Sequence, residues 1–165
     1  MSRFAVLALL VCLGACAAPP EQETASLAEL EAAAGPVAGP TQILPGDIAK
    51  LQVVESPAVG AVIADRERNT LYFNTQDGPS KSTCLEPECT LVWPPLLAAG
   101  GKIEAPGFDQ ALLGTTKRPD GLEQVTIAGK PVYRYVDDEV AGDATGHGVD
   151  DKWFAISPTG SKATR

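Results

Sequence analysis

Two segments of this chain follow the same pattern, and this internal echo constrains the fold more than any other feature. TLYFNTQD aligns without gaps on PVYRYVDD, so that Tyr72 falls on Tyr133. In the same alignment Asp77 falls on Asp138. Each segment forms the second arm of a predicted hairpin, with the tyrosine late in the strand and the aspartate opening the loop beyond. The echo therefore predicts a duplicated hairpin unit in which each tyrosine packs its ring at a strand end.

Short strands separated by turn residues are expected from residue 47 onward. β-branched and aromatic runs alternate with turn formers, and Ala128-Gly129 marks the clearer hairpin turn. Pro94-Pro95 would stop a short helix. We predict a mainly β domain of two pseudo-repeated hairpin units with short helical turns, covering 47–162, followed by a tail at 163–165. The expected strands are 51–55, 60–65, 70–74, 122–127, 130–136 and 152–156, and the expected helical turns lie within 89–97 and 108–114.

The first sixteen residues have the form of an export signal. Arg3 precedes an apolar run from Phe4 to Leu13, which is shorter than the roughly 20 residues that a spanning helix needs. The following Leu-Gly-Ala-Cys resembles the bacterial lipobox, in which the cysteine is acylated and becomes the new N-terminus. We therefore expect a signal peptide at 1–15 and a lipid anchor on Cys16. The alternative is a secreted protein in which this cysteine carries no lipid.

Residues 16–46 are expected to form a lipidated, flexible tether. They are rich in Ala, Pro and Glu and have no aromatic residue, so they can bury little apolar surface. The acyl chains would then be the link to the membrane. In Gram-negative cells an aspartate after the lipidated cysteine favours the inner membrane, and here that residue is Ala17. In a Gram-negative host the expected location is therefore the outer membrane, facing the periplasm.

The net charge argues against two classes of partner. The chain has 13 basic and 21 acidic residues, a net charge of −8, and it loses Arg3 with the signal. Nucleic-acid binding depends on neutralising phosphates with Lys and Arg, so no nucleic-acid partner is expected. Electrostatic docking on anionic lipid is disfavoured for the same reason, which leaves the acyl chains as the source of membrane affinity.

The cysteines divide by compartment. Cys12 lies in the signal and Cys16 in the lipobox, so Cys84 and Cys89 are the thiols left in an oxidising space. We predict one disulfide between them. A redox pair and a metal-thiolate site are the alternatives. Redox pairs usually read C-x-x-C, and the two glutamates between these cysteines would raise the thiol pKa values rather than lower them.

The segment DDEVAGDATGHGVDD (137–151) is the strongest candidate for chemistry. It holds six acidic residues and His147, the single histidine of the chain. Calcium takes six to eight oxygen ligands, which an Asp-rich glycine loop can supply, although the spacing is not that of an EF-hand. A transition metal at the histidine is a further alternative, and an ordinary acidic turn is the simplest. The candidate metal ligands are Asp138, Asp143, His147 and Asp150.

No catalytic motif is recognisable, so we expect no enzyme. The chain lacks G-x-S-x-G, H-E-x-x-H, a P-loop and a haem-attachment sequence. The aromatic residues are expected mainly in the core, and the alternative is a stacking surface for sugars or peptides. These residues are Tyr72, Trp93, Tyr133, Tyr135 and Trp153.

A set of ordered segments between residues 59 and 158 resembles a known family. The segments are TLYFNTQD, CLEPECTLVWPPL, PDGLEQVTIAGKPVYRYVDD, GDATGHGV and KWFAISP. Together they resemble the bacterial exported lipoproteins named for a Y-x-(F/W/Y)-x-x-D motif, also described as a secreted repeat of unknown function. The resemblance implies a small, β-rich exported domain whose motif residues are Tyr72, Asp77, Trp93, Tyr133, Tyr135, Asp138 and Trp153. Asn74 departs from the motif, which asks for an aromatic residue there.

These observations lead to two functional hypotheses. The first is a lipid-anchored envelope protein without enzymatic activity, which acts as a binding or structural module for an envelope protein or a small ligand. The second is a metal- or redox-linked accessory protein that uses the 137–151 loop with His147. No cofactor is expected under the first hypothesis.

Overall fold

The computed structural model describes residues 48–165; the predicted signal peptide, Cys16 and the whole of the predicted tether lie outside the described residues. The described part is mainly β, as the sequence predicts. Its elements in chain order are β1 (Ala49–Lys50), β2 (Gln52–Ser56), β3 (Gly60–Ala64), β4 (Tyr72–Asn74), α2 (Pro87–Thr90), η1 (Ala99–Gly101), β5 (Ile103–Glu104), η2 (Gln110–Leu112), β6 (Leu113–Lys117), β7 (Glu123–Ile127), β8 (Lys130–Pro131), η3 (Val149–Asp151) and β9 (Trp153–Ala155).

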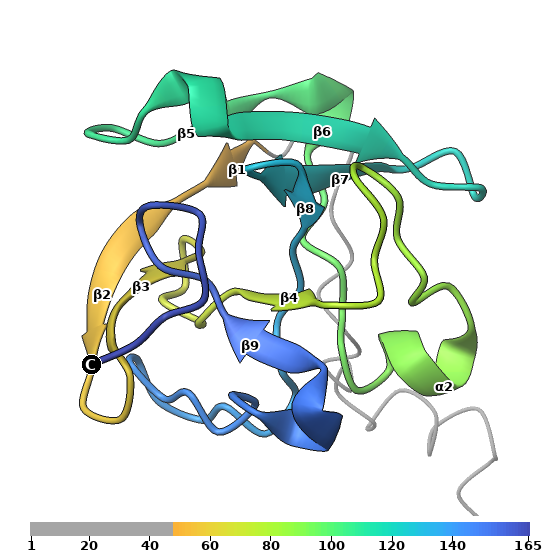
Figure 1. Ribbon diagram of the computed structural model, residues 1–165. Helices are drawn as coiled ribbons and strands as arrows, with labels where there is room; N and C mark the ends of the chain where they lie inside the picture. Colours follow the sequence, from red (N-terminus) through yellow and green to blue (C-terminus); the bar gives the residue numbers. More distant parts are fainter. Residues whose placement is uncertain (1–47) are drawn as a thin grey trace, which may run out of the picture. The chain divides into compact units, whose positions relative to one another are not determined.

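Two antiparallel hairpins frame the domain, β2–β3 on one side and β6–β7 on another (Figure 1). Their buried faces are β-branched: Ile63 of β3 and both Val125 and Ile127 of β7 have no exposed surface. Burying each such side chain contributes about 1.5–3 kcal/mol to the stability of the domain. Gly60 closes the first hairpin with a φ of +79°, a conformation that costs a glycine little.

Strands from one half of the domain pair with strands from the other half. We define a first repeat, residues 52–97, and a second repeat, residues 113–157. β4 of the first repeat pairs with β9 of the second, and these strands cross the middle of the domain in Figure 1. In return, Pro95 of the first repeat bridges Tyr133 of the second. Tyr72 and Tyr133 meet at the centre and exchange backbone N–H···O bonds of 2.8 and 2.9 Å.

Equivalent residues around this centre make equivalent backbone bonds. The N–H of Ile156 donates to the carbonyl of Leu71 at 2.9 Å, and the N–H of Leu96 donates to the carbonyl of Val132 at 3.0 Å. Each bond joins one repeat to the other. The internal duplication predicted from the tyrosine hairpins is therefore present, but as an intertwined pair rather than two adjacent units.

This exchange corrects the predicted hairpins. The turn at 65–69 forms, yet the arms beyond it share one bridge, Ala64↔Thr70, before β4 leaves to join β9. In the second repeat the strand predicted at 130–136 is limited to β8, because the chain after Pro131 turns to pair with the first repeat. Each second arm divides its backbone bonds between the two repeats: the N–H groups of Leu71 and Val132 donate to Ile63 and Val125 of their own hairpins, while Tyr72 and Tyr133 bond to each other across the repeats.

The core has two parts. One is aliphatic and lies among β3, β7 and the loops around Leu96. The other is aromatic and includes Tyr72, Trp93, Tyr133 and Trp153, each at most 4% exposed. The expectation that these aromatic rings belong to the core is confirmed for these four.

The smaller elements differ from prediction in detail. The helical turn is α2, which begins with Pro87 and ends before the two prolines instead of running into them. The turn predicted within 108–114 is η2. β1 pairs with β5 in a short parallel bridge that no sequence pattern indicated. Packing also extends into the predicted tail, because Ala163 is 1% exposed and donates its N–H to Ala155.

Candidate functional site

The two motif tyrosines bind the motif aspartates of the opposite repeat. The hydroxyl of Tyr72 donates to Oδ2 of Asp138 at 2.6 Å. The hydroxyl of Tyr133 donates to Oδ2 of Asp77 at 2.9 Å. A hydrogen bond to an ionised carboxylate is about twice as strong as one between neutral groups. The motif residues therefore join the two repeats. The sequence predicted only that each aspartate opens the loop after its own strand.

Each motif aspartate also caps the loop that follows it. Oδ1 of Asp77 accepts from the backbone N–H and the hydroxyl of Thr83, both at 2.7 Å. Oδ1 of Asp138 accepts in the same way from Thr145, at 3.0 and 2.6 Å. Both carboxylates are thus occupied by structural bonds. The two threonines were not singled out in the sequence, although they follow the aspartates at nearly equal spacings.

Burial raises the pKa of both tyrosines. The hydroxyl of Tyr72 is desolvated, and its bond to Asp138 raises its pKa further. Burial likewise raises the pKa of Tyr133, while a bond from Ser82 acts in the opposite direction. Both phenols are far from ionising at neutral pH. Neither is poised to act as a base.

The motif tryptophans stack on each other between the two tyrosines. The rings of Trp93 and Trp153 are 4.0 Å apart and nearly parallel. Trp93 meets Tyr72 edge to face at 5.5 Å, and Trp153 meets Tyr133 edge to face at 5.1 Å. Tyr135 extends the stack on the other face of the first repeat's tryptophan, at 4.4 Å from Trp93.

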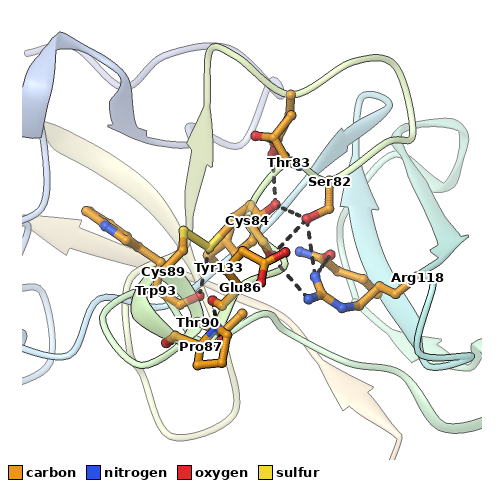
Figure 2. Close-up of a disulfide and its surroundings, with 12 residues drawn as sticks. Ser82, Thr83, Cys84, Glu86, Pro87, Cys89, Thr90, Trp93, Arg118 and Tyr133 are labelled. Atoms are coloured by element: carbon orange, nitrogen blue, oxygen red, sulfur yellow. Dashed lines mark hydrogen bonds between the residues drawn. A yellow bond between two sulfur atoms is a disulfide. The ribbon is translucent and has the colours of Figure 1, made fainter.

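The cysteine pair forms the predicted disulfide. Cys84 and Cys89 are bonded across the start of α2, and Cys84 is 1% exposed (Figure 2). The guanidinium of Arg118 binds the same loop, donating to the carbonyl of Cys84 at 3.1 Å and to Ser82 at 3.2 Å. The same buried guanidinium also donates to Gln124 at 2.8 Å and to Asp120 at 3.3 Å. A buried disulfide in a loop held by hydrogen bonds is typical of a structural disulfide.

The 137–151 loop does not gather its candidate ligands into a metal site. The carboxylate of Asp138 accepts hydrogen bonds from Tyr72 and Thr145. Oδ2 of Asp143 accepts from two backbone N–H groups of its own loop at 3.0 and 2.9 Å. Nδ1 of His147 accepts from the N–H of Ala155 at 3.3 Å. Within residues 48–165 no three His, Cys, Asp or Glu side chains form a group that would hold an ion. Asp150 lies in η3 with a φ of +52°.

A surface groove beside Tyr135 is the feature that the sequence did not indicate. It has a volume of about 390 Å³ and is formed by three separate segments of the chain. Two of its apolar side chains are largely exposed, Leu91 at 62% and Val136 at 56%. We call it the Tyr135 groove; it is lined by Asn69, Thr90, Leu91, Pro94, Pro95, Leu97, Arg134, Tyr135, Val136 and Asp138.

Carboxylates lie beside this groove, and Asp138 is among its lining residues. Arg134 contributes the one basic side chain among its lining residues, and its guanidinium pairs with Asp65 and, at 3.7 Å, with Glu67. The carboxylate of Asp137 raises the pKa of the Tyr135 phenol, and nearby Asp138 adds to that effect. The groove therefore combines an apolar floor with an acidic rim.

The two repeats differ at the position that forms this groove. Tyr135 of the second motif is half-exposed, whereas its counterpart Asn74 is buried at 7% exposure. Oδ1 of Asn74 accepts from the N–H of Gln76 at 2.8 Å and so closes the turn. The departure from the motif noted in the sequence thus removes an aromatic surface from the first repeat and leaves one in the second.

The fold defines a domain of two interlocked Tyr–Asp repeats. Residues 114–157 match the model of a family described as a secreted repeat of unknown function, which confirms the resemblance drawn from the motif. The matched stretch coincides with the second repeat, and the match fits an exported protein of unassigned activity. No curated protein and no solved structure matches the chain. Among residues 48–165 no helix is long and apolar enough to cross a membrane.

Proposed function

We propose that this chain is a lipid-anchored envelope protein whose globular domain acts as a binding module without enzymatic activity. The observation that carries the proposal is the Tyr135 groove, where exposed apolar side chains gather around one motif aromatic. Exposed apolar patches on small exported domains mark sites of interaction. The partner is an envelope protein or a small ligand that covers Leu91 and Val136.

The use of the motif residues supports a role without catalysis. Asp77 and Asp138 hold the repeats together, and both buried tyrosines stay protonated at neutral pH. The nitrogen Nδ1 of His147 is used by a backbone N–H. General acid–base chemistry needs a group with a pKa near the working pH and free to reach a substrate. These side chains serve the fold instead.

The anchor is the second part of the proposal. Cys16 would carry the lipid, and Ala17 favours the outer membrane, with the domain facing the periplasm. A Cys16→Ser variant should appear in the soluble periplasmic fraction, whereas the native chain stays with the membrane. Labelling with a palmitate analogue should mark the native chain and not the variant. Membrane retention of the unlabelled variant would refute the anchor.

The binding role can be tested with a photo-crosslinking residue placed at Val136. We expect a defined adduct in intact cells, because this side chain lines the groove and is 56% exposed. The matched control is Leu122, which is 49% exposed and lies outside the groove. A Leu91→Ser change in the same chain should remove the adduct. Equal crosslinking from both positions, or none from Val136, would contradict the proposal.

A further inference from the structure

We propose that the Tyr135 groove binds an extended, basic segment of a partner envelope protein, in which a lysine or arginine stands beside apolar residues. This inference rests on the proposed function and names the chemistry of the partner. It follows from three observations: the apolar side chains of the groove, the carboxylates beside it, and the acidity of residues 17–47 and of the chain as a whole.

The floor of the groove is built to receive apolar side chains. Leu91 follows α2 and Val136 follows Tyr135, so they stand on different segments, and the N–H of Val136 bonds to Val92 at 3.1 Å to hold those segments together. The ring of Tyr135 is fixed in place by its stacking on Trp93. A surface that is already ordered loses little conformational entropy when a ligand binds.

The rim of the groove favours a cation. The charge of Arg134 is more than offset, because Asp65 is 1% exposed and paired to it while Glu67 stands in solvent beside it. Asp137 and Asp138 lie at the phenol end of Tyr135. An aromatic ring flanked by carboxylates is a good site for an ammonium or guanidinium group.

Charge also indicates whether the groove binds another protein or a segment of this same chain. Residues 17–47 contain five acidic residues and no lysine or arginine, so this segment would bring like charge to the rim. A second copy would do the same, since the chain carries a net charge of −8 and the single Arg134 of the groove is outnumbered by Asp138, Asp65 and Glu67. Like charges placed opposite one another disfavour association, which leaves a basic partner.

The test uses the full chain in detergent and fluorescein-labelled synthetic peptides as probes. Three peptides share one pattern of leucines and prolines and carry lysine, glutamate or serine at the remaining positions. A fourth peptide keeps the lysines and replaces the leucines with serine. Fluorescence anisotropy should show saturable binding of the lysine–leucine peptide alone, weakening as salt is added because exposed charges are screened.

Variants locate the binding. Glu67→Gln and Asp137→Asn should each weaken the lysine–leucine peptide roughly two- to fivefold, the range of an exposed ion pair. The matched control is Glu55→Gln, an exposed acid whose side chain has no hydrogen bond or ion pair among residues 48–165, and it should change nothing. Leu91→Ser should abolish saturable binding, and thermal melting would verify that each variant is folded.

Two results would overturn the inference. One is equal binding of the lysine and glutamate peptides; the other is binding of the lysine peptides that survives Leu91→Ser or needs no leucine. If the crosslink at Val136 persists in cells while these peptides fail, the binding function stands and the basic chemistry of the partner is wrong. If both fail, the groove is not a binding site.

Discussion

The tyrosine hydroxyls that join the two repeats should stabilise the domain measurably. Tyr72→Phe keeps the buried ring and removes a single hydroxyl, the one bonded to Asp138 at 2.6 Å. Tyr133→Phe does the same to the 2.9 Å bond with Asp77. A hydrogen bond to a charged group contributes about 1.5–3 kcal/mol. Each variant should therefore lose about 2 kcal/mol of unfolding free energy, which for a domain of this size lowers Tm by about 8 °C.

The third tyrosine provides the control. Tyr135 has its hydroxyl at the surface, so Tyr135→Phe should stay within about 0.5 kcal/mol of the native chain. Urea unfolding followed by tryptophan fluorescence measures all three variants, because Trp93 and Trp153 are buried in the same aromatic cluster. The double variant of Tyr72 and Tyr133 should depart from additivity, since both bonds close the same pair of repeats. Losses below 0.5 kcal/mol in both single variants would refute a joining role for the motif.

Three further outcomes are expected. Reducing the Cys84–Cys89 disulfide should destabilise the domain by about 2 kcal/mol in the chain-entropy model, and a melting curve unaffected by reductant would contradict a structural role. Burial and Lys162 lower the pKa of His147, so the folded domain favours the neutral imidazole. The stability that this side chain contributes should be fully present above pH ~6.5 and should decrease as the pH falls toward the lowered pKa. A His147→Gln variant should lose this decrease in a pH series of melting curves. Gly146→Ala would place a methyl group 2.8 Å from the Trp93 ring and should lower the free energy of unfolding by about 1–3 kcal/mol, as measured by calorimetry. An unchanged Tm would contradict the tight packing of the aromatic rings at this position.

Local pattern was enough to predict the fold class and several strands. β-branched runs with turn residues between them identified β2, β3, β7 and β9 because those signals are local. β6 was missed, since its sequence LGTTK is half-exposed and has no clear alternation. The disulfide was also predictable, because Cys84 and Cys89 were the thiols that the export signal and lipobox left unassigned.

The pairing of the repeats was beyond local pattern. The spacing of Tyr72 to Asp77 is the same as that of Tyr133 to Asp138, and spacing alone cannot say which carboxylate each hydroxyl reaches. The structure shows that the partner lies in the other repeat. The Tyr135 groove was hidden for a similar reason, because its lining comes from three segments that are distant in sequence.

The strand exchange has a consequence for how such a domain can be divided. Since β9 completes the first repeat and Pro95 completes the second, neither half carries the partners for its own tyrosine. A chain cut between the repeats, within 99–112, should yield two fragments that are unfolded alone and regain the native fluorescence when mixed, which is fragment complementation. By the same logic a protein with a single repeat would be complete only as a symmetric homodimer, so the duplication in this chain is equivalent to a dimer joined by a linker.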